Sequence, residues 1–289
     1  MIAFVGSVFS PYYAAARRRG TSDPLDHVGI NAILYTPAGK YWSMTERGRA
    51  AIDRSPGHIA IGPSSWALVD DRLVIDIDEW TVPIPKRLCG RVTVDLGPVF
   101  RERFGLHWNG RHHWQPVAPC ARVSVEFERP GLSWQGKAYL DINTGTEPLE
   151  AGFRHWNWSR DERAHATRIH YDVVTRDGAR QDLAMEYRAD GSSGSIAPGR
   201  LQRLPKTGWR VERRARLSGD RIERQRTLED TPFYSRSMLT CDGVDGTIRS
   251  VHETVDLDRF ASRWCQILLP FKMPRRAGWV RRGSPLPPR

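Results

Sequence analysis

The sequence predicts an all-β protein whose short antiparallel strands form a sandwich or a barrel. Three observations lead to this prediction. Apolar and polar residues alternate in many short runs, which is typical of strands with one wet face. Turn dipeptides separate these runs, and helix signals are few. The long helical segments that a βαβ enzyme places between its strands are missing.

The predicted strands follow one another along the whole chain. Alternation is clearest at 72–78, 91–96 and 122–127. Further strand-like runs lie at 28–35, 59–61, 167–175, 182–187, 209–216, 221–228, 236–240 and 247–255. Turns are predicted at Pro-Gly 56 and 130, at Asp-Gly 177, 190 and 242, and at Ser-Gly 193 and 218. Short helices are expected at 46–54 and at 256–269, where Leu257, Phe260, Trp264 and Leu268 recur at spacings of three and four.

The domain organisation is predicted from one change in composition. The stretch 143–163 has the character of a connector rather than a strand. We therefore expect an N-terminal domain at 1–145 and a C-terminal domain at 146–273. A loose basic tail rich in Arg, Pro and Gly is expected at 274–289.

Composition and charge restrict the class of protein. The 289 residues carry 44 Lys and Arg against 33 Asp and Glu, a net charge of +11, and nearly all of the basic residues are Arg. Such a surface attracts anionic lipid or nucleic acid, or it is simply a general basic surface. No nucleic-acid-binding motif accompanies the charge, so we expect no nucleic-acid partner.

Location is predicted from apolar runs and cysteines. The longest apolar stretches, 2–9 and 267–271, are far shorter than the ~18–20 residues of a membrane span. No signal peptide is recognised, and the four cysteines form no CxxC pair. These features favour a cytoplasmic protein.

The first candidate site is the segment 107–116, which holds three histidines and two tryptophans. The spacing of His107, His112 and His113 matches no known zinc motif, so we expect no metal. If the segment is extended, His112 and Trp114 share a face of the strand. The alternative is that these aromatic rings fill a barrel mouth.

The second candidate site is the segment 136–143. Tyr139 and Asp141 point to one face of a strand, which would make an acid site with aromatic walls. An Asp that caps the turn at 143–145 explains the spacing equally well. No phosphate-binding loop, dinucleotide-binding motif or nucleophile elbow is present, so we expect no cofactor.

Five stretches carry a family resemblance: IAFVGSVFSPYYA at 2–14, DHVGINAILY at 26–35, HHWQPVAPCARV at 112–123, GKAYLDINTGTEPLEAGFRHWNWSR at 136–160 and TPFYSRSML at 231–239. In these stretches the chain resembles the carotenoid 1,2-hydratases, or hydroxyneurosporene synthases, of phototrophic bacteria. The resemblance implies two lipocalin-like halves. It also implies that a His-x-Trp motif, here His112 and Trp114, and a Tyr-x-Asp motif, here Tyr139 and Asp141, are functional. Relatives usually carry a further strand before 2–9, so the N-terminal domain is expected to lack that strand or to close differently.

The implied reaction adds water across the terminal C1=C2 double bond of an acyclic carotene such as neurosporene or lycopene, and gives a 1-hydroxy carotenoid. Protonation of an alkene requires a carboxylic acid that stays protonated, which an apolar setting achieves. Asp141 is the expected acid, Trp114 and Tyr139 are expected to stabilise the cation at C1, and His112 is the expected base. The scheme requires no cofactor or metal.

A C40 hydrocarbon dissolves in a bilayer, so the resemblance also implies work at a membrane surface. We expect peripheral association with the inner or photosynthetic membrane through arginines that bind anionic lipid. Two alternatives remain open. One is a non-catalytic, lipocalin-like isoprenoid-binding protein, and the other is a related isoprenoid cyclase-type enzyme.

Overall fold

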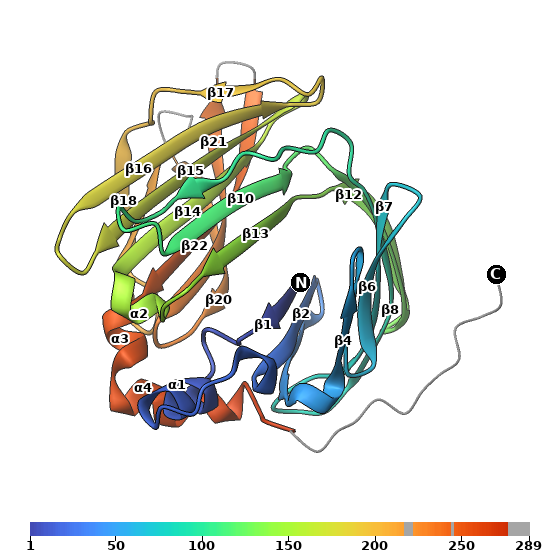
Figure 1. Ribbon diagram of the computed structural model, residues 1–289. Helices are drawn as coiled ribbons and strands as arrows, with labels where there is room; N and C mark the ends of the chain where they lie inside the picture. Colours follow the sequence, from blue (N-terminus) through green and yellow to red (C-terminus); the bar gives the residue numbers. More distant parts are fainter. Residues whose placement is uncertain (217–221, 244–245, 277–289) are drawn as a thin grey trace. The chain divides into compact units, whose positions relative to one another are not determined.

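The computed structural model describes residues 1–216, 222–243 and 246–276, and the chain in it is built mainly of β-sheet (Figure 1). Every pairing between its named strands in these residues is antiparallel, which confirms the all-β prediction. No helix within the described residues is long and apolar enough to cross a membrane.

Contacts divide the chain into two compact units. Among the described residues, the first contains 1–95, 122–136 and 266–276, and the second contains 96–121 and 137–265. Neither unit is one continuous stretch of chain. The boundary at 145–146 was inferred from a change in composition, and it stays a prediction.

The first unit contains a three-stranded and a seven-stranded sheet. The small sheet has the order β1 (Ile2–Val5), β2 (Val28–Thr36), β3 (Gly39–Arg47). The large sheet has the order β12 (Leu132–Lys137), β11 (Arg122–Arg129), β8 (Arg87–Asp95), β7 (Arg72–Trp80), β6 (Ser64–Val69), β5 (His58–Ile61), β4 (Ile52–Ser55). Short helices accompany them: α1 (Pro11–Arg18), η1 (Pro24–Asp26), η2 (Arg49–Ala51) and η3 (Leu269–Phe271). A further helix, α4 (Arg263–Leu268), runs directly into η3, and its first three residues, up to Cys265, belong to the second unit.

One prediction about local structure in this unit was wrong. The helix expected at 46–54 is only the turn η2, because strand β3 continues to Arg47. Arg47 is buried there and donates to Glu79 at 2.8 Å, an ion pair that holds this end of β3 against β7. At the start of the expected tail, the backbone N–H groups of Glu46 and Arg276 donate to the carbonyls of Pro274 and Glu46. The looseness of the tail stays a prediction. Residues 277–289 of that tail lie outside the described residues.

The second unit is built around another seven-stranded sheet. Its order is β17 (Ser193–Ser195), β16 (Arg180–Arg188), β15 (Ala166–Thr175), β14 (Phe153–Glu162), β22 (Gly246–Asp256), β21 (Tyr234–Gly243), β20 (Ile222–Asp230). A three-stranded sheet has the order β13 (Leu140–Gly145), β10 (His112–Ala118), β9 (Phe104–Gly105), and β18 (Leu201–Leu204) pairs with β19 (Arg213–Arg216). The helices are α2 (Leu149–Gly152) and α3 (Leu257–Ala261).

Strand β14 lies in the middle of this sheet, although its sequence was expected to be a connector. Its two faces differ because side chains alternate along a strand. Asn157 and Ser159 lie on the face that β19 covers, where the Ser159 hydroxyl donates to the Arg216 carbonyl at 3.0 Å. Trp158 and Arg160 lie on the opposite face. Both faces are occupied, so the strand lacks the simple apolar and polar alternation that identified the others.

Candidate active site

The two motifs predicted from the sequence lie on neighbouring strands of the second unit. Strands β10 and β13 pair with Trp114 opposite Asn143, Pro116 opposite Asp141 and His112 opposite Gly145. Tyr139 directly precedes β13 and shares a side with Asp141, as their spacing of two requires. The register therefore brings Trp114, Tyr139 and Asp141 together.

These three side chains form a hydrogen-bonded triangle. The Trp114 indole N–H lies 2.9 Å from Asp141 Oδ2 and 3.2 Å from Tyr139 Oη, and the Tyr139 hydroxyl donates to Asp141 Oδ2 at 3.1 Å. The amide of Asn143 approaches the same oxygen at 3.4 Å. Within the described chain, every hydrogen bond to this carboxyl group ends on Oδ2, which leaves Oδ1 to carry a proton.

The surroundings favour the protonated form of Asp141. Protein packed around the carboxyl group raises its pKa above the usual value, and the negative charge of Glu253 raises it further. The hydrogen bonds from Trp114 and Tyr139 act in the opposite direction, because they stabilise the carboxylate. Burial, with the nearby charge of Asp141, holds the pKa of Tyr139 well above its usual range, so this hydroxyl remains a donor.

Aromatic rings from β14, β15 and β9 enclose the triangle. The Trp158 ring lies 5.3 Å from Tyr139, and the Tyr171 ring, which is opposite Trp158 in the register, lies 5.5 Å from Trp114. Phe104 contacts Trp114 from another direction, also at 5.5 Å. Trp114 is fully buried between these rings, and its N–H is directed at the acid.

Three charged residues near the triangle were not identified from the sequence. Glu253 is opposite Trp158 in the β14–β22 register, and Arg236 on β21 donates to Glu253 Oε1 at 2.9 Å. The guanidinium of Arg160 lies 5.6 Å from the centre of the Tyr139 ring. The aromatic and basic stretch 153–160, which contains Trp158 and Arg160, was the sequence signal that could have identified this side of the site. Glu253 and Arg236 reach it only through strand pairing, which no local sequence pattern indicates.

His112 occupies a separate position on the same face of β10. Four residue pairs separate the His112–Gly145 and Pro116–Asp141 positions, roughly 13 Å at the usual rise of a strand. His112 Nε2 lies 3.3 Å from Glu147 Oε1, and burial lowers the pKa of the imidazole, which favours the neutral ring. Gly145 and Gly152 enclose it tightly, since a Cβ on either glycine would lie within 3.0 Å of the ring.

The described residues contain no group of three or more His, Cys, Asp or Glu side chains arranged to hold a metal ion. His107 accepts a hydrogen bond from the backbone N–H of Asn109, and His113 lies on the opposite face of β10 from His112.

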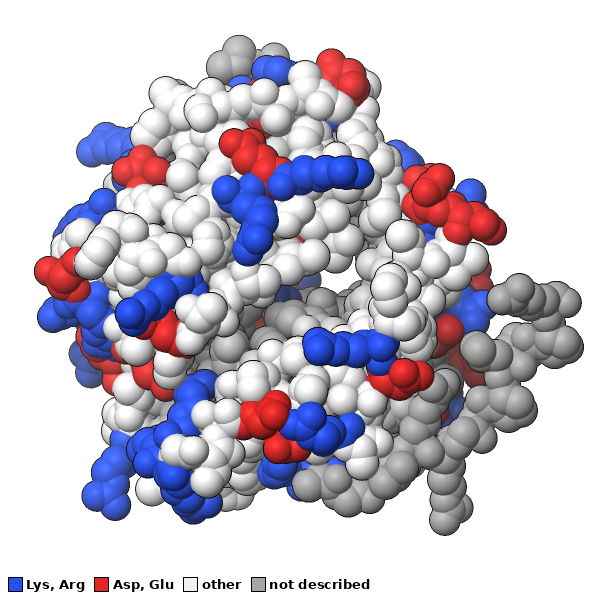
Figure 2. Space-filling view, viewed as in Figure 1, with Lys and Arg blue, Asp and Glu red and all other residues white. Residues whose placement is uncertain are grey.

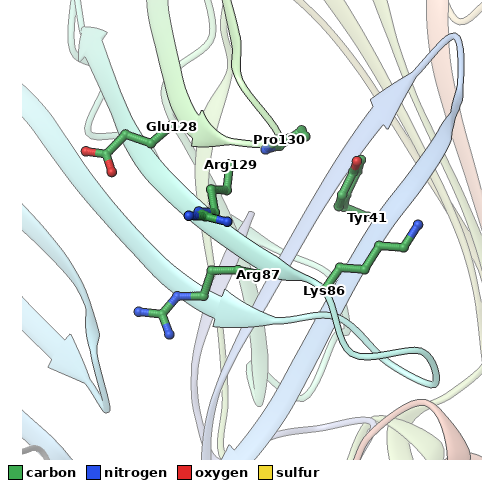
Figure 3. Close-up of a pocket in the computed structure, with 6 residues that line it drawn as sticks. All are labelled: Tyr41, Lys86, Arg87, Glu128, Arg129 and Pro130. Carbon is green, nitrogen blue, oxygen red and sulfur yellow. The ribbon is translucent and has the colours of Figure 1, made fainter.

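A surface pocket in the first unit has a different character. The pocket has a volume of about 480 Å³. It is lined by Tyr41, Lys86, Arg87, Glu128, Arg129 and Pro130 (Figure 3). Its lining is mainly charged, so it does not suit a hydrocarbon chain.

Comparison with known proteins agrees with the sequence motifs. The profile of the carotenoid hydratase CrtC family matches residues 1–282. The acyclic carotenoid 1,2-hydratase of Thiocapsa roseopersicina is 47% identical over 280 residues, which cover 96% of this chain and 69% of that protein. The enzyme of the same name from Cereibacter sphaeroides is 36% identical, over 96% of this chain and 99% of that protein.

A solved structure supports the architecture. The crystal structure of an AttH protein from Nitrosomonas europaea matches with a TM-score of 0.55 at 12% identity, over 79% of this chain and 80% of that one. This similarity concerns the fold alone, and it agrees with the lipocalin-like architecture predicted above. The sequence matches extend over nearly the whole chain, and the chain therefore belongs to the carotenoid hydratase CrtC family.

Proposed function

We propose that this protein is an acyclic carotenoid 1,2-hydratase, which adds water across the terminal C1=C2 double bond of neurosporene, lycopene or a similar carotene. The observation that carries the proposal is the carboxyl group of Asp141. Its Oδ2 accepts hydrogen bonds from Trp114, Tyr139 and Asn143, its pKa is raised by burial, and aromatic rings surround it. An acid of this kind is what protonation of an alkene requires. We propose that the reaction proceeds without a cofactor.

In the first step, Asp141 Oδ1 gives its proton to C2 and the π electrons form the new C–H bond. The positive charge remains on the tertiary carbon C1. The faces of Tyr139 and Trp158 line this region and stabilise a cation by about 0.5–2 kcal/mol each. The ring of Trp114 is enclosed by protein, so its contribution is to orient the acid through its N–H.

In the second step, water adds to C1 and the resulting oxonium loses a proton. His112 is the base that the family resemblance implies. Its imidazole is neutral, and Glu147 would stabilise the protonated ring. Because His112 lies well away from Asp141 along β10, a chain of water molecules is required between it and the reacting carbon. Glu253 is the second candidate, because it shares the sheet face of Trp158 and its charge acts on Asp141. Return of the proton to Asp141 Oδ1 completes the cycle.

The substrate indicates where the protein works. An acyclic carotene resides in the bilayer, and we propose that this protein binds the cytoplasmic surface of the inner or photosynthetic membrane. Figure 2 shows basic side chains distributed over the visible surface among acidic ones. The net charge of +11 favours anionic lipid.

A decisive experiment incubates the full-length protein with lycopene or neurosporene in liposomes prepared in D2O, and analyses the products by mass spectrometry. A hydratase gives a product that has gained one water and carries deuterium at C2. A cyclase gives an isomer without added water, and a non-catalytic carrier returns the substrate unchanged. The Asp141→Asn variant is the matched control, since it keeps the shape of the side chain but cannot act as the acid. Hydration by this variant at the wild-type rate would contradict the assignment of Asp141.

A further inference from the structure

Residues 266–271, the part of α4 and η3 that belongs to the first unit, have apolar side chains on two sides. Leu269 is buried against the protein. The other side presents Ile267, Leu268 and Phe271, which are 69%, 37% and 70% exposed. We call these three residues the exposed stripe. Phe271 follows Ile267 by four positions and Leu268 by three, which places them along one face of the segment.

The exposed stripe differs from ordinary surface exposure of apolar residues. Single exposed apolar side chains are common on proteins, whereas several large ones in a row mark an interaction surface. The hydrophobic benefit of folding explains the buried Leu269, but it does not explain three neighbouring large side chains that are exposed. A partner that removes these side chains from water would explain them.

The charge around the exposed stripe indicates what this partner is. From Arg259 to the C-terminus the sequence has no Asp or Glu. Over the same stretch it carries eight basic residues: Arg259, Arg263, Lys272, Arg275, Arg276, Arg281, Arg282 and Arg289. Two of these, Arg259 and Arg275, form ion pairs with Asp256 and Glu46 within the protein, so we do not count them as lipid-binding residues. An apolar face beside basic side chains is the pattern of a segment that lies in the plane of an anionic membrane. A second copy of this chain would bring the same positive charges together, and these would repel one another.

We propose that the exposed stripe inserts into the headgroup region of an anionic bilayer, while the adjacent basic residues bind lipid phosphates. The segment is far too short to cross the membrane, so it would rest in the interface. The proposal extends the proposed function, because it names the part of the chain that holds the protein at the bilayer where its substrate is dissolved.

The test measures co-sedimentation of the full-length protein with carotenoid-free vesicles of phosphatidylcholine and phosphatidylglycerol. Wild-type protein is compared with the double variant Ile267→Ser, Phe271→Ser. Each substitution should weaken partition about tenfold, and the double variant about a hundredfold. In about 1 M salt, where the Debye length is only about 3 Å, the wild type should retain measurable binding and the double variant should not.

Ile84→Ser is the matched control, because Ile84 is 70% exposed but lies elsewhere in the first unit. This variant should bind vesicles like the wild type. Circular dichroism and thermal unfolding verify that all variants are folded, which the exposure of the substituted side chains favours.

Two results would overturn the proposal. One is a double variant that binds vesicles like the wild type. The other is a wild-type dimer, detected by light scattering, that the double variant converts to monomer without any change in vesicle binding, since the stripe would then cover a second copy. Hydration of carotene in detergent is assayed separately. If the double variant loses vesicle binding but the wild-type protein hydrates no carotene, the proposed function is refuted while the docking surface is supported.

Discussion

Trp114→Phe tests whether this residue orients the acid or stabilises the cation. The substitution keeps an aromatic ring between Phe104 and Tyr171 but removes the N–H that donates to Asp141 Oδ2 at 2.9 Å. If the N–H is what matters, Trp114→Phe and Trp114→Leu should both lose it and fall to similar rates. If the ring face stabilises the cation, the Phe variant should remain about tenfold faster than the Leu variant.

The pH dependence separates the two roles more directly. A hydrogen bond to a charged group contributes about 1.5–3 kcal/mol, and one pKa unit corresponds to about 1.36 kcal/mol. Loss of the donor destabilises the carboxylate, so the pKa of Asp141 should rise further. The protonated acid then persists to higher pH, so the alkaline limb of the rate profile should move to higher pH. The maximal rate should fall.

The assay is the initial rate of hydration in carotene-containing liposomes, measured across the pH range. Trp134→Phe is a suitable control, since Trp134 is an exposed tryptophan on β12. An alkaline limb that stays in place for Trp114→Phe, together with a large gap between the Phe and Leu variants, would refute the orienting role and restore the cation-stabilising one.

Three further variants test the acid and His112. Asp141→Asn should reduce turnover by at least about 100-fold. Because the pKa of Asp141 is raised in the folded state, the wild-type protein loses stability as the pH rises from the unfolded pKa through the folded one. The thermal stability of the Asn variant should therefore exceed that of the wild type by more near pH 8 than near pH 4. An equal difference at both pH values would contradict the raised pKa. Glu253→Gln removes a neighbouring negative charge and should lower the pKa of Asp141, so the alkaline limb of the rate profile should move to lower pH, opposite to Trp114→Phe. An unchanged limb would show that Glu253 does not act on the acid. Gly145→Ala places a Cβ 2.7 Å from His112 Nδ1, so it should displace the ring and lower the unfolding free energy by about 1–3 kcal/mol. Its activity should fall to the level expected of His112→Ala. Wild-type activity would argue against a catalytic His112.

The strands with one wet face were predictable from the sequence because their alternation reports burial directly. The runs at 72–78 and 122–127 lie within β7 and β11. Strand β14 was missed because protein covers both of its faces, one polar and one aromatic, so no apolar and polar alternation remains. The helix at 256–269 was expected from apolar spacing, but spacing does not say which way a face points. The structure buries Phe260 and leaves Trp264 exposed.

The sequence by itself determined the all-β class, the family motifs and the pairing of Tyr139 with Asp141 on one side of the chain, because these depend only on period and local order. Only the tertiary structure decided what surrounds them. Antiparallel register joins Trp114 to residues 25 and 27 positions away, and it places Glu253 on the same sheet face as Trp158. Contacts between residues so distant along the chain arise from strand pairing, which leaves no periodic trace in either strand alone. The same limit applies to His112, whose shared face with Trp114 was predictable, while its separation from the acid was set by the register of β10 and β13.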